Sequence, residues 1–395
     1  MKKLMLTTAI ASVLTTAAVA QTSITGELRL SYKDVSAPRG LANTGTVGSS
    51  NNTSYGFGAE QQINFANKGK LNIGGLDYAA GFSIENDGEQ TGTLFNENVY
   101  MDLTNASSGT TISFGRDHIQ RSDSDFSATN LVGFTPNELS QLTNGTSGGT
   151  RFSQNIGPAT SQAYGAAIVQ RSPFGTFSYN FVPNNAAPSA GTLNATTGQG
   201  QAASTAAQGS TTVVGTGVPV VNASLVGNAA SEAVNDNTTA AYEYGFVGNL
   251  GVNGLTAHYF KSANNDFANV WANGAVKAEA KNYGVKYNFG TFTVGANKKK
   301  YNPEAASLIE NTETAYAAAV AINKDLSVGA LYGKAEQAGG AGVVGAGVEQ
   351  KIKGINVGYN LGPVALAAGY AKNTDAQGQA GADNDVFMIR LLGAF

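Results

Sequence analysis

The residue types that could carry out nucleophilic chemistry lie together in one short stretch of the chain. His118 follows Asp117 and precedes Ser122 and Ser124 in TTISFGRDHIQRSDSDF, which offers the side chains of a Ser/His/Asp hydrolase. Nearness in sequence does not make a triad, because the base must reach the nucleophile and be oriented by a third group. A hydrolase is therefore the least favoured function, and the sequence predicts that no residue is catalytic.

Residues that could bind a metal or a redox group are scarce. The chain has no cysteine and two histidines, His118 and His258, which excludes disulfides and thiolate metal sites and leaves little for zinc. The stretch from Asp123 to Asp125 is acidic but lacks the number of ligands that calcium requires. We expect neither a metal nor a cofactor.

The first twenty residues have the pattern of a secretory signal peptide. Lys2 and Lys3 precede an apolar stretch that closes on an A-x-A site at Ala18 to Ala20. The stretch holds only about sixteen residues, fewer than the roughly twenty that a transmembrane helix needs. We expect cleavage after Ala20.

The charge of the mature chain argues against a nucleic-acid partner. Loss of Lys2 and Lys3 lowers the number of basic residues from 24 to 22, against 27 acidic residues, which gives a formal charge of −5. A protein that binds nucleic acid needs the opposite balance, because phosphate contacts dominate that affinity.

The remaining chain, 21–395, reads as a single all-β domain. Hydrophobic residues make up 42% of the sequence, yet no uninterrupted apolar run of about eighteen follows the signal, which excludes membrane-spanning helices. The 50 glycines punctuate short segments without a regular repeat.

These segments alternate between apolar and polar residues. In SITGELRLSYK, one face carries Ile24, Leu28, Leu30 and Tyr32, and the other carries Glu27, Arg29 and Lys33. One face suits lipid and the other suits water, although a soluble sandwich alternates in the same way.

The connections distinguish these two folds, because very short turns alternate with long polar loops. The short turns are 172–175, 249–254, 289–292, 323–325 and 361–363, and the long loops are 35–52, 88–93, 117–161, 183–238, 264–276, 302–311, 338–348 and 375–382. A strand on each side of every long loop gives sixteen antiparallel strands, with both termini on the short-turn side, as in a transmembrane β-barrel. The predicted strands are 22–34, 53–66, 77–87, 94–104, 109–116, 162–171, 175–182, 239–249, 254–263, 277–289, 290–301, 312–323, 324–337, 349–361, 362–374 and 383–395.

One segment, TRFSQN at 150–155, could be another strand. A seventeenth strand would place the 183–238 loop on the wrong side of the barrel, so we assign 150–155 to a loop.

The last strand, VFMIRLLGAF, should close the barrel against SITGELRLSYK. Its alternation sends Phe387, Ile389, Leu391 and Phe395 toward lipid or a neighbouring subunit and Arg390 toward water. The other predicted lipid-facing side chains are mostly aromatic, and they are Tyr242, Tyr244, Phe246, Leu255, Tyr259, Tyr287, Phe289, Tyr359 and Tyr370. Lys281 and Lys351 would also face outward, so each must lie near a strand end.

The alternating strands, the rhythm of short and long connections, the first strand and the terminal Phe395 resemble the general diffusion porins of Gram-negative outer membranes, above all the alphaproteobacterial kind. The resemblance covers the whole mature chain and is most specific in SITGELRLSYK, TTISFGRDHIQRSDSDF and the C-terminal strand. It implies an integral protein of the cell outer membrane, in contact with its lipid, that forms a homotrimer. It also implies that the outer-membrane assembly machinery reads Phe395.

In such porins a long third loop folds into the barrel and narrows it, and here that loop would be 117–161. The predicted acidic residues of the constriction are Asp117, Asp123, Asp125 and Glu138, which outnumber Arg121 and Arg151 in the same loop. The inward phase of the strands predicts basic lumen residues at Arg29, Lys33, Lys286, Lys299 and Arg390, with Arg121 added by the loop. Fixed charges at such a narrow point choose which ions pass, and the acidic loop favours a weak cation preference.

The 183–238 loop departs from the family pattern. The segment from Asn184 to Ser231 contains no charged residue, and most of its residues are small or polar. We interpret it as a flexible extracellular surface loop, with a lid, a phage-receptor surface or a partner surface as the alternative. Its VVGTGVPVVNASLV stretch could form a small extra hairpin.

The predicted function is a passive, water-filled channel for small hydrophilic solutes and ions. Sixteen strands leave an aqueous channel, and the predicted inner faces are rich in Gly, Ala, Ser, Thr and Asn. A substrate-specific channel with a weak solute-binding site is the alternative. It would need aromatic rails for sugars or a basic ladder for phosphate, and the presumed loop has neither as a compact run.

Overall fold

We describe a computed structural model of the chain. The residues whose structure is described here are 21–36, 54–71, 73–86, 95–115, 127–140, 152, 165–182, 212–214, 218–220, 241–268, 275–303, 310–338, 347–376 and 380–395. Within this part of the chain, no helix is long and apolar enough to span a bilayer.

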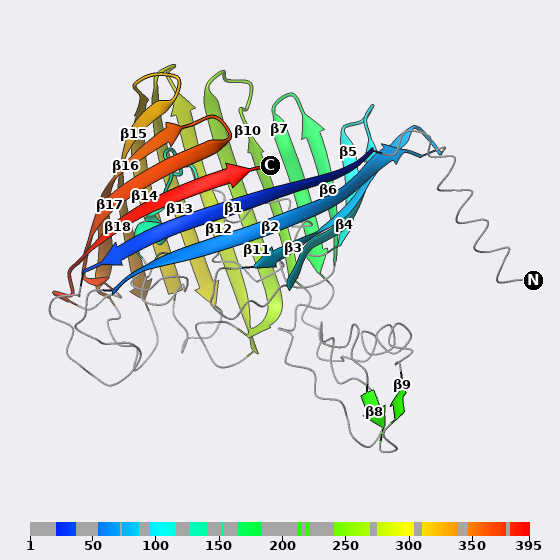
Figure 1. Ribbon diagram of the computed structural model, residues 1–395, viewed down its shortest axis with the longest axis horizontal. Helices are drawn as coiled ribbons and strands as arrows, with labels where there is room; N and C mark the ends of the chain where they lie inside the picture. Colours follow the sequence, from blue (N-terminus) through cyan, green and yellow to red (C-terminus); the bar gives the residue numbers. More distant parts are fainter. Residues whose placement is uncertain are drawn as a thin grey trace, which may run out of the picture.

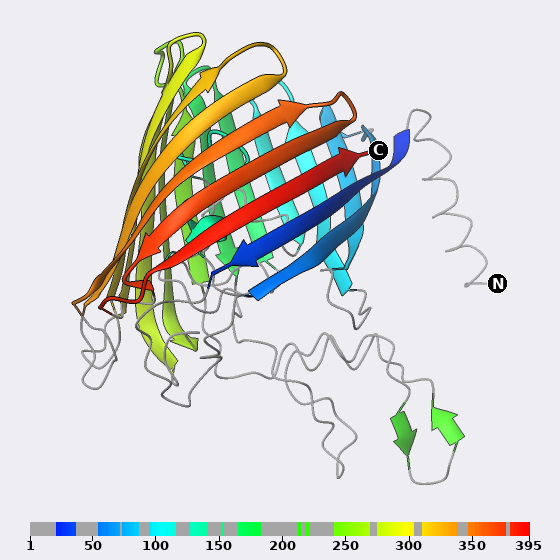
Figure 2. The same cartoon turned by 60° about the vertical axis from the view of Figure 1, so that its left-hand side comes forward.

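Sixteen antiparallel strands form one closed barrel, which confirms the predicted fold and strand count (Figures 1 and 2). Each strand pairs with its neighbours in the chain, except that β7 pairs directly with β10 across the 183–240 connection and β1 pairs with β18. The barrel strands are β1 (Gln21–Val35), β2 (Ser54–Lys70), β3 (Leu76–Asn86), β4 (Phe95–Asn105), β5 (Thr110–Gly115), β6 (Gly165–Ser172), β7 (Gly175–Val182), β10 (Ala241–Gly248), β11 (Leu255–Ala268), β12 (Ala275–Asn288), β13 (Phe292–Pro303), β14 (Glu310–Ala321), β15 (Leu326–Ala338), β16 (Glu349–Asn360), β17 (Val364–Thr374) and β18 (Asn384–Ala394).

Two further elements lie in the long connections. The strands β8 (Thr212–Val214) and β9 (Val218–Val220) pair as a separate hairpin within the predicted VVGTGVPVVNASLV region. A short helix, α2 (Pro136–Ser140), follows β5. Of the 150–155 segment only Phe152 is described, and it lies in no strand.

One hairpin is longer than the sequence predicts. We assigned 264–276 to a loop because it is polar, but β11 continues to Ala268 and β12 begins at Ala275, with a register shift between Asn264 and Phe267. The ladder is made by backbone N–H and C=O groups, so a polar segment can continue it.

The first and last strands close the barrel as predicted. Gly26 N donates to Phe395 O at 2.7 Å and Phe395 N donates to Gly26 O at 3.0 Å, so the terminal residue belongs to the ladder. The Phe395 ring lies over Gly26, where a Cβ would come within 2.2 Å of it. The absence of a side chain at position 26 therefore makes room for the terminal ring.

Asparagine side chains shape the short turns at one end of the barrel. Asn249 Oδ1 accepts from Gly251 N at 2.9 Å, Asn288 Oδ1 from Gly290 N at 2.6 Å, and Asn360 Oδ1 from Gly362 N at 2.9 Å. Such a side chain mimics a backbone turn, and glycine supplies the positive φ that follows. Both ends of the described chain, at Gln21 and Phe395, lie at this short-turn end.

The two faces of the wall differ as the alternation predicts. Large apolar side chains, including Ile24, Phe57, Tyr244 and Leu391, are exposed on the outer face. The predicted lipid-facing residues all lie on that face, and so do Lys281 and Lys351. Buried side chains gather instead on the inner face, where Phe134, Leu139 and Phe152 pack against Ile352 and Val386.

Candidate pore constriction

A segment of the connection between β5 and β6 lies inside the barrel against one wall. Residues 127–140, which include α2, follow the inner faces of β13 to β18 (Figures 1 and 2). Phe134 and Leu139 are fully buried there among Leu331, Val386 and Met388. Burial of two large apolar side chains is what holds this segment to the wall, because each removes its apolar area from water.

The wall accepts the segment because its inward residues are small. A Cβ at Gly369 would lie 2.7 Å from the Phe134 ring, and one at Gly295 would lie 2.0 Å from Ala128 O. Val132 packs in the same way between Gly329 and Gly358. We interpreted the small inner residues as the lining of a water-filled lumen. On this wall that interpretation was wrong, because several of these small residues pack against residues 127–140.

Three inward asparagines of the wall bind the backbone of the segment. Asn356 Nδ2 donates to Phe134 O at 3.0 Å, and Asn373 Nδ2 donates to Leu139 O at 3.2 Å. Asn297 Oδ1 accepts from Ala128 N at 3.2 Å. The sequence analysis did not single out these residues. Their signal was present, since each has the inward parity of its strand.

The short helix α2 begins with a capping box. Glu138 Oε2 accepts from Thr135 N at 2.8 Å and from Thr135 Oγ1 at 3.0 Å, and Thr135 Oγ1 accepts from Glu138 N at 3.3 Å. Pro136 occupies the first helical position, where a backbone N–H would have no partner within the helix. The cap uses one carboxylate oxygen of Glu138 and leaves Oε1 for another partner.

That partner is Arg390 of β18, which joins the segment to the wall electrostatically. Arg390 Nη2 donates to Glu138 Oε1 at 2.5 Å, and its guanidinium carbon lies 4.7 Å from the centre of the Phe134 ring. Lys33 of β1, only 4% exposed, donates from Nζ to Glu138 O at 3.3 Å. Three of the predicted site residues, Lys33, Glu138 and Arg390, therefore form one cluster.

Arg29 is held by a different set of partners. Its guanidinium donates to Glu27 Oε1 at 2.9 Å and also pairs with Glu60 of β2. The sequence analysis missed several inward carboxylates of the wall as site residues, and these are Glu27, Glu60, Glu85, Asp102, Glu243 and Glu313. Glu27 could have been found, because it shares the strand face of Arg29.

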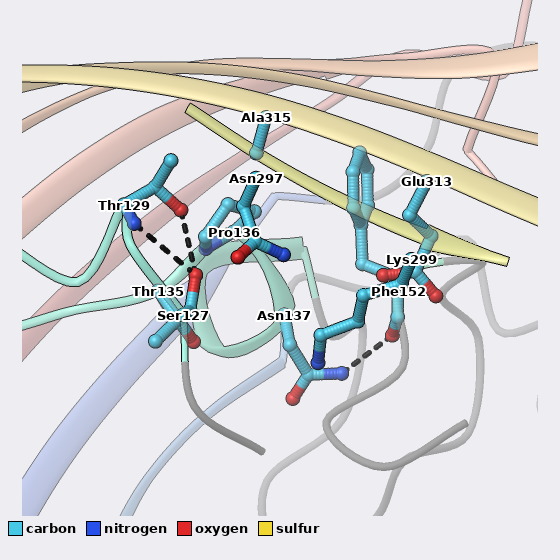
Figure 3. A pocket seen from close by; sticks show the side chains of 10 residues that line it. All are labelled: Ser127, Thr129, Thr135, Pro136, Asn137, Phe152, Asn297, Lys299, Glu313 and Ala315. Carbon is cyan, nitrogen blue, oxygen red and sulfur yellow. Dashed lines mark hydrogen bonds between the residues drawn. The ribbon is translucent and has the colours of Figure 1, made fainter. Parts of the chain in front are cut away.

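Lys299, Lys286 and His258 face inward from three neighbouring strands. Lys299 lies opposite Glu313 across the β13–β14 pair, and both line a cavity of about 50 Å³ between wall and segment (Figure 3). Asn137 crosses beside this cavity and donates from Nδ2 to Phe152 O at 2.5 Å. His258 Nε2 lies 3.2 Å from Asn282 Oδ1. The cavity has room for water or a small ion, not for an organic solute.

Comparisons with known proteins agree with this architecture. The family model described as Gram-negative porin matches residues 7–379. The chain belongs to the Gram-negative porin family. No curated protein sequence matches it.

Solved porin structures share the fold of this porin at low sequence identity. An anion-selective porin from Comamonas acidovorans is 13% identical, with a TM-score of 0.60 over 95% of this chain and 100% of that one. The trimer form of OmpT from Vibrio cholerae is 12% identical, with a TM-score of 0.56 over the same shares. A triple mutant of the Rhodopseudomonas blastica porin is 13% identical, with a TM-score of 0.51, again over 95% and 100%.

The family and the closed barrel make this porin a channel of the Gram-negative outer membrane. The signal peptide with Ala20, and the site residues Asp117, Arg121, Asp123 and Asp125, lie outside the described residues and stay predictions. The hydrolase residues His118, Ser122 and Ser124 lie outside them too. Within the described part of the chain, no group of three His, Asp or Glu side chains is placed to hold a metal ion.

Proposed function

We propose that this porin is a passive diffusion channel for small hydrophilic solutes and ions, narrowed by residues 127–140. The observation that supports this most directly is the fixed position of that segment on the inner wall, through Phe134, Leu139 and the Glu138–Arg390 pair. A sixteen-stranded barrel is wide enough to hold water. A segment fixed to one side of it reduces the width that remains for solutes.

We also propose that fixed charges in the lumen give a weak cation preference. The inner face carries the carboxylates Glu27, Glu60, Glu85, Asp102, Glu138, Glu243 and Glu313, and also the basic groups of Arg29, Lys33, Lys286, Lys299 and Arg390. Asp117, Asp123 and Asp125 would add further negative charge in the loop, partly offset by Arg121. The anion selectivity of the Comamonas porin does not argue against this, since that likeness extends to the fold alone.

Conductance in planar bilayers tests both proposals. We expect stepwise conductance from the purified porin, with a reversal potential across a KCl gradient on the cation side. Asp123→Asn with Asp125→Asn should shift that potential toward anions. The control pair Glu336→Gln with Glu349→Gln removes the same charge from the outer face and should leave it unchanged.

Three results would contradict these proposals. A bilayer that stays sealed would show that the protein does not form a channel. An unchanged reversal potential in the Asp123 and Asp125 variant would show that those residues do not face the pore. Full block by micromolar amounts of one sugar or phosphate compound would instead favour the substrate-specific alternative.

We further propose that the porin works as a homotrimer and that the assembly machinery reads Phe395. The trimer is supported by the trimer form of OmpT, and the assembly role by Phe395, which is 75% exposed although its backbone pairs with Gly26. Phe395→Ala keeps the backbone bonds to Gly26 but removes the ring. We expect unchanged refolding in detergent, and in cells a several-fold loss of the complex of three-protomer mass from the outer membrane. Equal losses in refolding and in the outer membrane would show that the ring acts only in closing the barrel against Gly26.

A further inference from the structure

Eight lysines face outward from one side of the barrel, at a similar height. They are Lys261, Lys281, Lys298, Lys300, Lys334, Lys351, Lys353 and Lys372, on the strands from β11 to β17. Each occupies the seventh to tenth place from the short-turn end of its strand. At about 3.3 Å per residue and the usual strand tilt, this places them roughly 15–23 Å up the barrel axis, in the outer half of an apolar band about 25 Å tall, from which lysine side chains can extend toward the headgroups.

The strand register places these lysines directly beside one another. Lys261 lies opposite Lys281, and Lys281 lies opposite Lys300 on the next strand, which makes a row of three. Lys334 lies opposite Lys351, and Lys353 lies opposite Lys372. Like charges in directly opposed positions of a sheet repel one another, so these rows need negative charge beside them.

Carboxylates of the protein supply part of that charge. Glu279 bridges Lys261 at 2.5 Å and Lys281 at 2.7 Å, and Glu349 bridges Lys334 at 2.9 Å and Lys351 at 3.5 Å. Among the described residues, no ion pair involves the remaining four lysines, which are Lys298, Lys300, Lys353 and Lys372. Asp385 lies opposite Lys372, and Glu310 and Glu336 also face outward, yet the eight lysines still outnumber the described carboxylates of this face.

Tyrosines mark the height of these rows as the edge of the bilayer. Tyr244 lies opposite Lys261, Tyr283 opposite Lys298, and Tyr332 opposite Lys353. Tyrosines in outer-membrane barrels gather at the level of the lipid headgroups. The described outer faces from β1 to β10 carry no lysine or arginine, so the basic rows belong to one side of the barrel.

We propose that the lysine rows bind the phosphate groups of anionic lipids in the outer leaflet. Glu279 compensates one of the three charges of Lys261, Lys281 and Lys300, so these side chains present a strip of net positive charge in the outer half of the wall, with apolar wall below it for the acyl chains. A phosphate between neighbouring lysines would replace the missing negative charge. The proposal does not depend on what passes through the channel.

Lipid binding to the folded porin in neutral detergent tests the proposal. The probe is dioleoyl phosphatidic acid, counted per protomer by native mass spectrometry, with dioleoyl phosphatidylcholine as the zwitterionic comparison. We expect phosphatidic acid to bind at least fivefold more tightly than phosphatidylcholine. The variant Lys261→Gln, Lys281→Gln, Lys300→Gln should lose at least fivefold of that affinity, and the Arg triple at the same positions should keep it.

The matched control is Lys68→Gln, Lys70→Gln, Lys324→Gln, which removes three charges at the short-turn end and should bind like the unaltered porin. Heat-dependent mobility in gels verifies that each variant is folded. Equal binding of both phospholipids, or equal binding by the Gln triple, would overturn the proposal. Displacement of the lipid by an equal concentration of inorganic phosphate would overturn it too, because the rows would then be a site for free anions.

Discussion

Removal of the two apolar anchors, by Phe134→Ala with Leu139→Ala, is expected to release residues 127–140 from the wall and raise single-channel conductance. Both side chains are fully buried against β15 to β18. Truncation of a buried Phe costs about 3–5 kcal/mol and of a buried Leu about 2–5 kcal/mol. The barrel ladder does not include this segment, so the loss should fall on the docking of the segment and leave barrel closure intact.

The measurement is conductance per channel and its noise in planar bilayers, with heat-dependent mobility in gels to show that the barrel is folded. The control Phe387→Ala with Leu391→Ala removes the same two residue types from the outer face of β18, the strand that carries Arg390. We expect the control to conduct like the unaltered porin. An unchanged conductance in the Phe134 and Leu139 variant would show that the segment does not set the width of the pore.

The barrel was predictable from the sequence because its signals are local. Alternation over five or six residues assigns a face to each side chain, and Asn and Gly residues mark the short turns, as at Asn288 and Gly290. The predicted strand bounds were wrong mainly in β11 and β12, where the ladder continues into the segment that we assigned to a loop.

The packing of residues 127–140 on the wall could not be predicted in the same way, because it depends on contacts between distant residues. Phe134 meets Gly369, and Ala128 meets Gly295, across large separations in the chain. An inward glycine has the same local pattern whether water or a loop lies over it. The lysine row shows a similar limit, since parity sends Lys281 outward but only the register places it between Lys261 and Lys300.

For the predicted charged residues, the sequence was enough to assign the face of the wall but not the partner. Strand parity alone was enough to place Arg29, Lys33 and Arg390 on the inner face. The pairing of Arg390 with Glu138 required the fold of the segment, and the pairing of Arg29 with Glu60 required the β1–β2 register. A formal count of lumen charges is therefore a poor measure of the field, since paired charges cancel at a distance.

The second large effect is expected from Glu138→Gln, which removes the charge of the Glu138–Arg390 pair without removing the helix cap. Glutamine is also accepted at the third position of a capping box, so its amide oxygen can still receive Thr135 N. Arg390 would then lose the carboxylate that it binds, whereas Lys33 keeps its bond to the backbone oxygen of Glu138. A hydrogen bond to a charged group contributes about 1.5–3 kcal/mol. The side chains of Arg390 and Glu138 are 16% and 24% exposed, so the loss of stabilisation should lie at the lower end of that range.

The measurement is the reversal potential across a KCl gradient, which should move toward anions in Glu138→Gln because one negative charge is removed beside Arg390. Arg390→Gln should move it the opposite way. The double variant should return close to the unaltered value, because both charges of the pair are gone. Equal shifts from Glu138→Gln and from the outer-face control Glu336→Gln would assign the effect to net charge and contradict a role for this pair in the pore.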